Sequence, residues 1–169
     1  MWGSGPDEQP APPTTEAAGE EPRVELLILR LRGERYALAV EQVGGVDERC
    51  PVTPLPGTPP GVIGVFSRLG DVLPALDLAM LLQEAPSPAE GGLFTVGRAS
   101  AGPVALLVDE VESVVAVELS RIEPPLPALD PTRAQLLRGQ VQIDGRWVSL
   151  LDLEGIVAVV AGRAQASRG

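Results

Sequence analysis

The sequence predicts an all-β protein built from two related small lobes. Between residues 24 and 161 the chain consists of short β-rich runs separated by Gly, Pro or Asp-Gly turns. Such close spacing is typical of small barrels or a sandwich rather than of alternating strands and helices. Two of the runs recur later in the chain, and helical segments are few and short. Together these observations favour two small β-barrels packed against each other.

The strands are expected in the following order. Residues 24–40 predict two strands joined at a tight turn centred on Arg32-Gly33-Glu34. The later strands are expected in "PGVIGVF", "DVLPALDL", "GLFTVGR", "PVALLVDEV", "SVVAVEL", "RGQVQID" and "RWVSLLDL". Short helices are expected at 77–83, 131–137 and 153–161. Their N-caps are predicted to be Asp77, Asp130 and Asp152, because a side-chain oxygen can accept from free N–H groups there.

The two ends of the chain are expected to lie outside the folded part. Residues 1–22 are rich in Pro, Gly, Ala and Glu and show no apolar periodicity, which predicts a disordered N-terminal tail. Residues 162–169 are expected to form a fraying C-terminal tail. Residues 23–161 are therefore predicted to form a single domain of two intertwined lobes.

Composition excludes several classes of function. Only 3% of the residues are aromatic, the net charge is −10, and all 13 basic residues are Arg. Nucleic-acid binding needs a basic surface and stacking platforms, and an acidic surface also disfavours anionic membranes. Histidine is absent, and the lone Cys50 can form neither an internal disulfide nor a zinc site. Without a membrane-spanning run or a signal pattern, the protein is expected to be soluble and cytoplasmic.

An internal repeat supports the two-lobe prediction. "GDVLPALDLAMLL" (70–82) aligns without a gap with "GRWVSLLDLEGIV" (145–157), at an offset of 75 residues. "YALAVEQV" (36–43) aligns with "VALLVDEV" (104–111), at an offset of 68 residues. Each lobe alone would be a marginal domain, so the two are expected to pack together. Their meeting surface is expected to offer a groove, where binding sites often lie.

The aspartates of the repeat are interpreted as structural. Asp77 and Asp152 occupy equivalent positions before apolar helical turns, so helix capping explains both. Asp71 aligns with Arg146 and is expected to be an exposed turn residue. The alternative is a carboxylate-based hydrolase using Asp71, Asp77 or Asp109 with Glu110. That alternative is disfavoured, because the sequence supplies no nucleophile–base pair, phosphate loop or metal cluster.

Four segments in order resemble the CheW-like domain of bacterial chemosensory systems. They are "YALAVEQV", "PPGVIGVFSRLGDVLPALDL", "PVALLVDEVESVVAV" and "LLRGQVQIDGRWVSLLDLEGIV", and the resemblance runs from about Val24 to Ala161. It implies two SH3-like five-stranded β-barrels, no catalysis, no cofactor and a scaffold role. It also implies that one barrel docks on the regulatory domain of a CheA-type histidine kinase. The groove between the barrels would receive the cytoplasmic tip of a methyl-accepting chemoreceptor.

Two departures from the family pattern bear on partner choice. The family usually shows Asn-Leu-Arg-Gly where this chain has Ser67-Arg68-Leu69-Gly70, so the arginine is displaced by one position. A family glutamate is replaced by Gly45, and an arginine that often follows Asp-Leu is replaced by Ala79. The resemblance implies that this glutamate and arginine pair with each other, so both are lost together. The departures favour a divergent system, such as one controlling pili or surface motility, or altered partners.

The candidate partner-binding residues lie near these motifs. They are Val43, Val46, Ile63, Arg68 and Leu69, with Arg68, if exposed, as the strongest single candidate. Core packing is the alternative for each aliphatic residue. The expected partners are the kinase regulatory domain and the receptor tip, with no nucleic acid and no direct membrane insertion. An alternative function is an interaction module that recruits or localises proteins outside the receptor–kinase complex.

Overall fold

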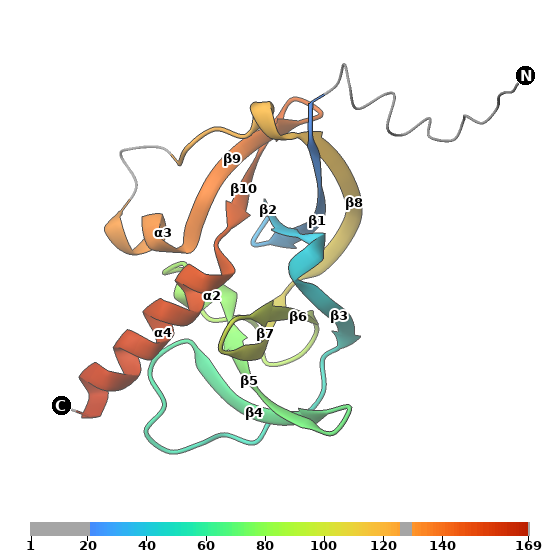
Figure 1. The fold of residues 1–169 in the computed structure, drawn as a ribbon. Helices are drawn as coiled ribbons and strands as arrows, with labels where there is room; N and C mark the ends of the chain where they lie inside the picture. The colour runs from blue at the N-terminus through green and yellow to red at the C-terminus, as the bar shows by residue number, and fades with distance from the viewer. Residues whose placement is uncertain (1–20, 126–129, 169) are drawn as a thin grey trace, which may run out of the picture.

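The computed structural model describes residues 21–125 and 130–168 of the chain, and in this part the strands form two five-stranded sheets (Figure 1). Lobe A has the strand order β8-β1-β2-β10-β9, and lobe B has the order β3-β6-β7-β5-β4. The strands of lobe A are β1 (Arg23–Leu31), β2 (Glu34–Ala39), β8 (Glu110–Glu118), β9 (Leu137–Ile143) and β10 (Arg146–Leu151). Those of lobe B are β3 (Val43–Glu48), β4 (Val62–Arg68), β5 (Asp71–Asp77), β6 (Leu93–Ala99) and β7 (Gly102–Val108). The predicted mostly-β architecture of two related lobes is confirmed.

The internal repeat appears in the strand register. In lobe A, β2 and β10 run parallel and Ala37 lies opposite Leu150. In lobe B, β7 and β5 run parallel and Ala105 lies opposite Ala75. The 68-residue offset of the repeat aligns Ala37 with Ala105, and the 75-residue offset aligns Ala75 with Leu150. The two strand contacts are therefore equivalent. Each lobe therefore joins a strand from one copy of the repeat to a strand from the other copy.

This exchange follows from two crossings of the chain between the sheets. After β2 a 3-10 turn, η2 (Val40–Gln42), leads the chain into β3 of lobe B. After β7 the chain passes into β8 of lobe A. A second 3-10 turn, η3 (Leu119–Arg121), follows β8. The lobes are consequently intertwined rather than consecutive along the chain.

Equivalent tight turns end the two hairpins that carry the repeat. Leu69 and Gly70 join β4 to β5 with φ values of 52° and 88°, and Asp144 and Gly145 join β9 to β10 with φ values of 53° and 76°. Two successive positive φ values are characteristic of type I′ hairpin turns, which match the twist of antiparallel strands. Leu69 thus lies in the turn at the end of the hairpin of β4 and β5.

Three helical segments lie together beside the lobes in Figure 1: α2 (Leu78–Leu81), α3 (Pro131–Leu136) and α4 (Leu153–Arg168). All three occur where the sequence predicted helices, but α4 extends seven residues beyond the expected end at residue 161. The expected C-terminal tail is therefore helical through Arg168. A 3.3 Å hydrogen bond from Arg163 Nη1 to the Pro60 carbonyl supports the extension. Of the predicted N-terminal tail, residues 1–20 lie outside the described part.

Buried aliphatic side chains hold the two lobes together. The largest cluster lies between the sheets and the helices and includes Leu29, Leu38, Leu78, Leu106 and Leu153. Smaller clusters fill the interior of each lobe. In lobe B, Phe66 and Phe94 stack with ring centroids 4.9 Å apart. The low aromatic content thus leaves a core built mainly of Leu, Val, Ile and Ala.

Candidate functional site

The aspartates of the repeat lie at helix N-termini. Asp77 is buried at the start of α2, where its carboxylate accepts from Ala79 N–H at 3.1 Å and from the N–H and hydroxyl of Ser87 at 2.9 and 2.8 Å. Asp152 precedes α4 and accepts from Gly155 N–H at 2.9 Å. Both carboxylates thus satisfy backbone donors that the first helical turn leaves free.

The acidic residues considered for a hydrolase do not converge on one place. Asp71 and Asp77 stand at opposite ends of β5. Asp109 accepts from the backbone N–H of Arg32 at 2.8 Å, and Glu110 is exposed on the following strand. Within residues 21–125 and 130–168, no three His, Cys, Asp or Glu side chains are grouped in a way that could hold a metal ion. No helix of the same residues is long and apolar enough to cross a membrane.

The five candidate partner-binding residues all belong to lobe B. Val43 and Val46 lie on β3, Ile63 and Arg68 on β4, and Leu69 in the turn after β4. β3 and β4 are the two outer strands of their sheet. The structure therefore brings these residues to the edges of one lobe.

The aliphatic candidates differ in exposure. Leu69 is 86% exposed and Val46 is 39% exposed, so both side chains are available to a partner. Val43 is partly buried and packs against the main core, which makes core packing its principal role. Ile63 packs partly on the interior of lobe B and also lines a surface hollow. Val72, which sequence reasoning missed, is 70% exposed and is the second residue of β5, after the turn that carries Leu69.

Arg68 is held by an ion pair instead of being freely exposed. Its Nε donates to the carboxylate of Asp47 on β3, and its side chain is only 20% exposed. Because β3 and β4 are the outer strands, this pair joins the two edges of lobe B. A Cβ atom at Gly45 would collide with the Arg68 guanidinium, so the glycine leaves room for the pair.

Asp47 therefore supplies the ion-pair partner of Arg68, two positions beyond Gly45, which stands where the family pattern has a glutamate. Residues two apart on a strand share a face, so Asp47 lies on the same side of β3 as position 45. Sequence reasoning identified the loss at Gly45 but missed Asp47. The signal was present as an acidic residue two positions further along the same strand.

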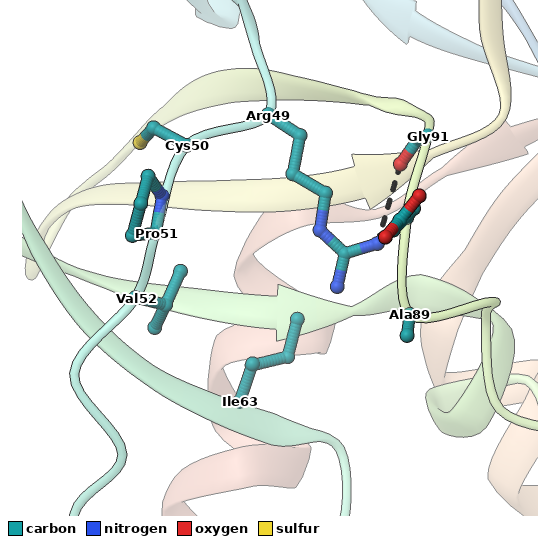
Figure 2. A pocket seen from close by; sticks show the side chains of 8 residues that line it. Arg49, Cys50, Pro51, Val52, Ile63, Ala89 and Gly91 are labelled. Atoms are coloured by element: carbon teal, nitrogen blue, oxygen red, sulfur yellow. Dashed lines mark hydrogen bonds between the residues drawn. The ribbon is translucent and has the colours of Figure 1, made fainter.

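Ile63 lines a surface hollow of about 450 Å³. Figure 2 shows the Arg49 side chain reaching across it to Gly91. Arg49 Nη1 donates to the carbonyls of Pro88 and Gly91 at 2.8 and 3.2 Å, which ties the segment after β3 to the loop before β6. Cys50 and Val52 line the same hollow. A neighbouring hollow of about 560 Å³ shares Arg49 and Ile63 and extends towards Met80.

The geometry defines a two-lobed β-barrel protein with exposed aliphatic side chains and hollows along the edges of one lobe. A family model for the CheW-like domain matches residues 25–161. The chain belongs to the CheW-like domain family and is a non-catalytic scaffold of the chemosensory type.

Individual relatives agree with this assignment. The chain is 29% identical over 133 residues to the chemotaxis protein CheW of Rhizobium meliloti, covering 78% of this chain and 86% of that protein. It is 31% identical over 160 residues to protein FrzA of Myxococcus xanthus, covering 92% and 99%. The crystal structure of the scaffolding protein TtCheW from Thermoanaerobacter tengcongensis superposes with a TM-score of 0.74 at 20% identity, covering 80% of this chain and 92% of that one. That similarity confirms the fold class.

Proposed function

We propose that this protein couples chemoreceptors to a CheA-type histidine kinase in a bacterial chemosensory array. Lobe B docks on the regulatory domain of the kinase through its outer strands, and the junction between the lobes receives the cytoplasmic tip of a methyl-accepting receptor. The protein acts in the cytoplasm and reaches membrane-associated arrays through these partners. Its mechanism is binding alone: kinase activity changes because the assembly favours one arrangement of the kinase.

The exposed aliphatic side chains of lobe B carry this proposal. Val46, Leu69 and Val72 are all large apolar residues open to solvent on the outer strands of the lobe or in the hairpin between β4 and β5. Exposed apolar surface of this kind is typical of protein-binding sites when several such residues occur together. The names of the chemotaxis relatives support the chemosensory setting.

Calorimetric titration with the regulatory domain of the cognate kinase tests the proposal. Val46→Asp is expected to weaken binding at least about tenfold, because the interface would bury an unpaired charge. Val114→Asp is the matched control: Val114 occupies the equivalent position in lobe A and is 55% exposed, against 39% for Val46. Absence of binding by the wild-type protein at high micromolar concentrations would rule out the proposal. Equal weakening by both variants would rule out docking through lobe B.

A second candidate function is an interaction module that recruits or localises proteins outside the receptor–kinase complex. Arg68 pairs with Asp47, whereas the glutamate and arginine that the resemblance pairs with each other are replaced by Gly45 and Ala79; these differences favour altered partners. Gene neighbourhood separates the two candidates. An adjacent CheA-type kinase and chemoreceptor favour coupling, whereas their absence favours the second function.

A further inference from the structure

Equivalent β-bulges of the two lobes carry different residues at the bulged position. In lobe A the pairing between β1 and β8 shifts register so that Val111 lies opposite Leu29 and Ser113 lies opposite Ile28. Glu112 is the extra residue between them. A bulge turns its extra residue out of the ladder and can direct that side chain to a new place.

Glu112 forms ion pairs with two arginines at this end of lobe A. Its Oε2 accepts from Arg30 Nε at 2.9 Å, and its Oε1 accepts from Arg35 Nε at 3.0 Å. Arg30 and Arg35 are cross-strand partners in the hairpin of β1 and β2. The Glu112 side chain is only 19% exposed. Lobe A therefore closes this end with its own carboxylate.

Lobe B has the same bulge without the carboxylate. Val43 lies opposite Gly97 and Gly45 lies opposite Val96, which leaves Gly44 as the extra residue. The 68-residue offset of the repeat carries Gly44 onto Glu112. The bulge is thus preserved in both lobes, but its extra residue has no side chain in lobe B.

One of the two arginines of this end is retained in lobe B. The same offset carries Arg30 onto Arg98 and Arg35 onto Pro103, which are again cross-strand partners. Arg98 is exposed and forms no ion pair with any residue of the ranges 21–125 and 130–168. Lobe B therefore keeps the cation, Arg98, but has no carboxylate at the position of Glu112.

A hollow of about 340 Å³ occupies the end of lobe B, and we call it the lobe B mouth. All five strands of the lobe or their turns contribute to its lining, which consists of Gly44, Arg68, Leu69, Asp71, Leu73, Val96, Arg98, Ala99, Gly102 and Pro103. A Cβ atom at Gly44 would lie 3.5 Å from Arg98 Cγ and 3.4 Å from Val96 Cγ1, which is ordinary contact. The mouth thus has space for a side chain that extends past Arg98.

We propose that the lobe B mouth receives a Glu or Asp side chain from the kinase regulatory domain, which takes the place that Glu112 fills in lobe A. The inference rests on the proposed function for the identity of this partner. Arg98 binds the carboxylate, while the exposed Leu69 in the lining of the mouth contacts apolar neighbours of the acid. Because this chain carries a net charge of −10, the carboxylate has to stand on a partner surface that is otherwise apolar or basic.

A stability comparison tests whether the mouth accepts a carboxylate at all. Gly44→Glu and Gly44→Gln are compared in the wild-type background and with Arg98→Gln. In the wild-type background the Glu variant is expected to melt about 2–4 °C above the Gln variant, because only Glu forms the ion pair. The difference should vanish with Arg98→Gln. Equal melting temperatures of the two variants in both backgrounds would overturn the inference.

Titration of the full-length variants with the kinase regulatory domain then tests the occupant. Gly44→Glu and Arg98→Gln should each bind about tenfold more weakly than wild type, since one fills the mouth and the other removes its cation. Asp71→Asn removes a negative charge that would repel the incoming carboxylate, so this variant should bind at least as tightly as wild type. Arg146→Gln is the control and should leave binding unchanged. Arg146 lies in lobe A, at the position that corresponds to Asp71 of lobe B.

The two proposals fail in different ways. Failure of the wild-type protein to bind overturns both the kinase docking and this inference. Wild-type binding that Gly44→Glu and Arg98→Gln leave unchanged overturns the inference and leaves the docking intact. Self-association of the wild-type chain that Gly44→Glu abolishes would place a second copy in the mouth and overturn the assignment to the kinase.

Discussion

The ion pair between Arg68 and Asp47 is expected to stabilise lobe B by joining its two outer strands. Arg68 is 20% exposed and Asp47 is 39% exposed, so solvent screens the pair only in part. Exposed ion pairs contribute about 0.2–1 kcal/mol, and hydrogen bonds to charged groups contribute about 1.5–3 kcal/mol. We therefore expect a coupling free energy of about 1 kcal/mol, equivalent to about 2–4 °C in melting temperature for a protein of this size.

A double-mutant cycle measures this coupling. The free energy of unfolding is determined by urea denaturation for the wild type, Arg68→Ala, Asp47→Ala and the double variant. The coupling should also decrease at about 1 M salt, where the Debye length falls to about 3 Å. A coupling energy indistinguishable from zero at low salt would refute the closing role of the pair.

Gly45 provides an independent check on the same geometry. Gly45→Ala places a Cβ atom against the Arg68 guanidinium and should displace it from Asp47. The loss of stability caused by Gly45→Ala should therefore be about 1 kcal/mol smaller in the Arg68→Ala background, because the pair is already absent there. An equal loss in both backgrounds would show that the glycine is needed for another reason.

Further predictions concern the helices, each measured by urea denaturation or circular dichroism. Asp77→Ala should lower the free energy of unfolding by about 2 kcal/mol, because it removes a helix cap and leaves buried donors unpaired; no change would contradict the capping role. Gly155→Ala should destabilise by about 2 kcal/mol, since its Cβ would collide with the Gln135 carbonyl, whereas Gly162→Ala in the same helix should stabilise by up to about 1 kcal/mol. Truncation after Ala161 should reduce the helical signal at 222 nm; an unchanged signal would contradict the extended α4.

Sequence patterns that act locally predicted most of the fold. The turns at Gly70 and Gly145, the alternating strands and the acidic N-caps depend on neighbouring residues, so a single sequence displays them. The predicted end of α4 at residue 161 was wrong, because the following "GRAQASRG" lacks the apolar periodicity that indicates a helix. Its Ala, Arg and Gln residues nevertheless favour helix, and Arg163 reaches Pro60 only in the folded chain.

Features that depend on distant residues were not predictable in the same way. The exchange of strands between the copies of the repeat is decided by tertiary register, which the alignment alone does not determine. The sequence left the exposure of Arg68 open, because nothing in it placed Asp47 of β3 beside the end of β4. The repeat aligns Gly44 of lobe B with Glu112 of lobe A. The role of Glu112, however, is visible only in the structure, where it pairs with Arg30 and Arg35.

Reconstitution of kinase signalling tests the central claim most directly. The autophosphorylation rate of the cognate CheA-type kinase is measured with membranes that contain its chemoreceptor, with and without this protein. Coupling predicts that the wild-type protein makes the kinase rate respond to receptor ligand, that Val46→Asp loses this effect, and that Val114→Asp retains it. A kinase rate and ligand response that are identical with and without saturating wild-type protein would contradict the account.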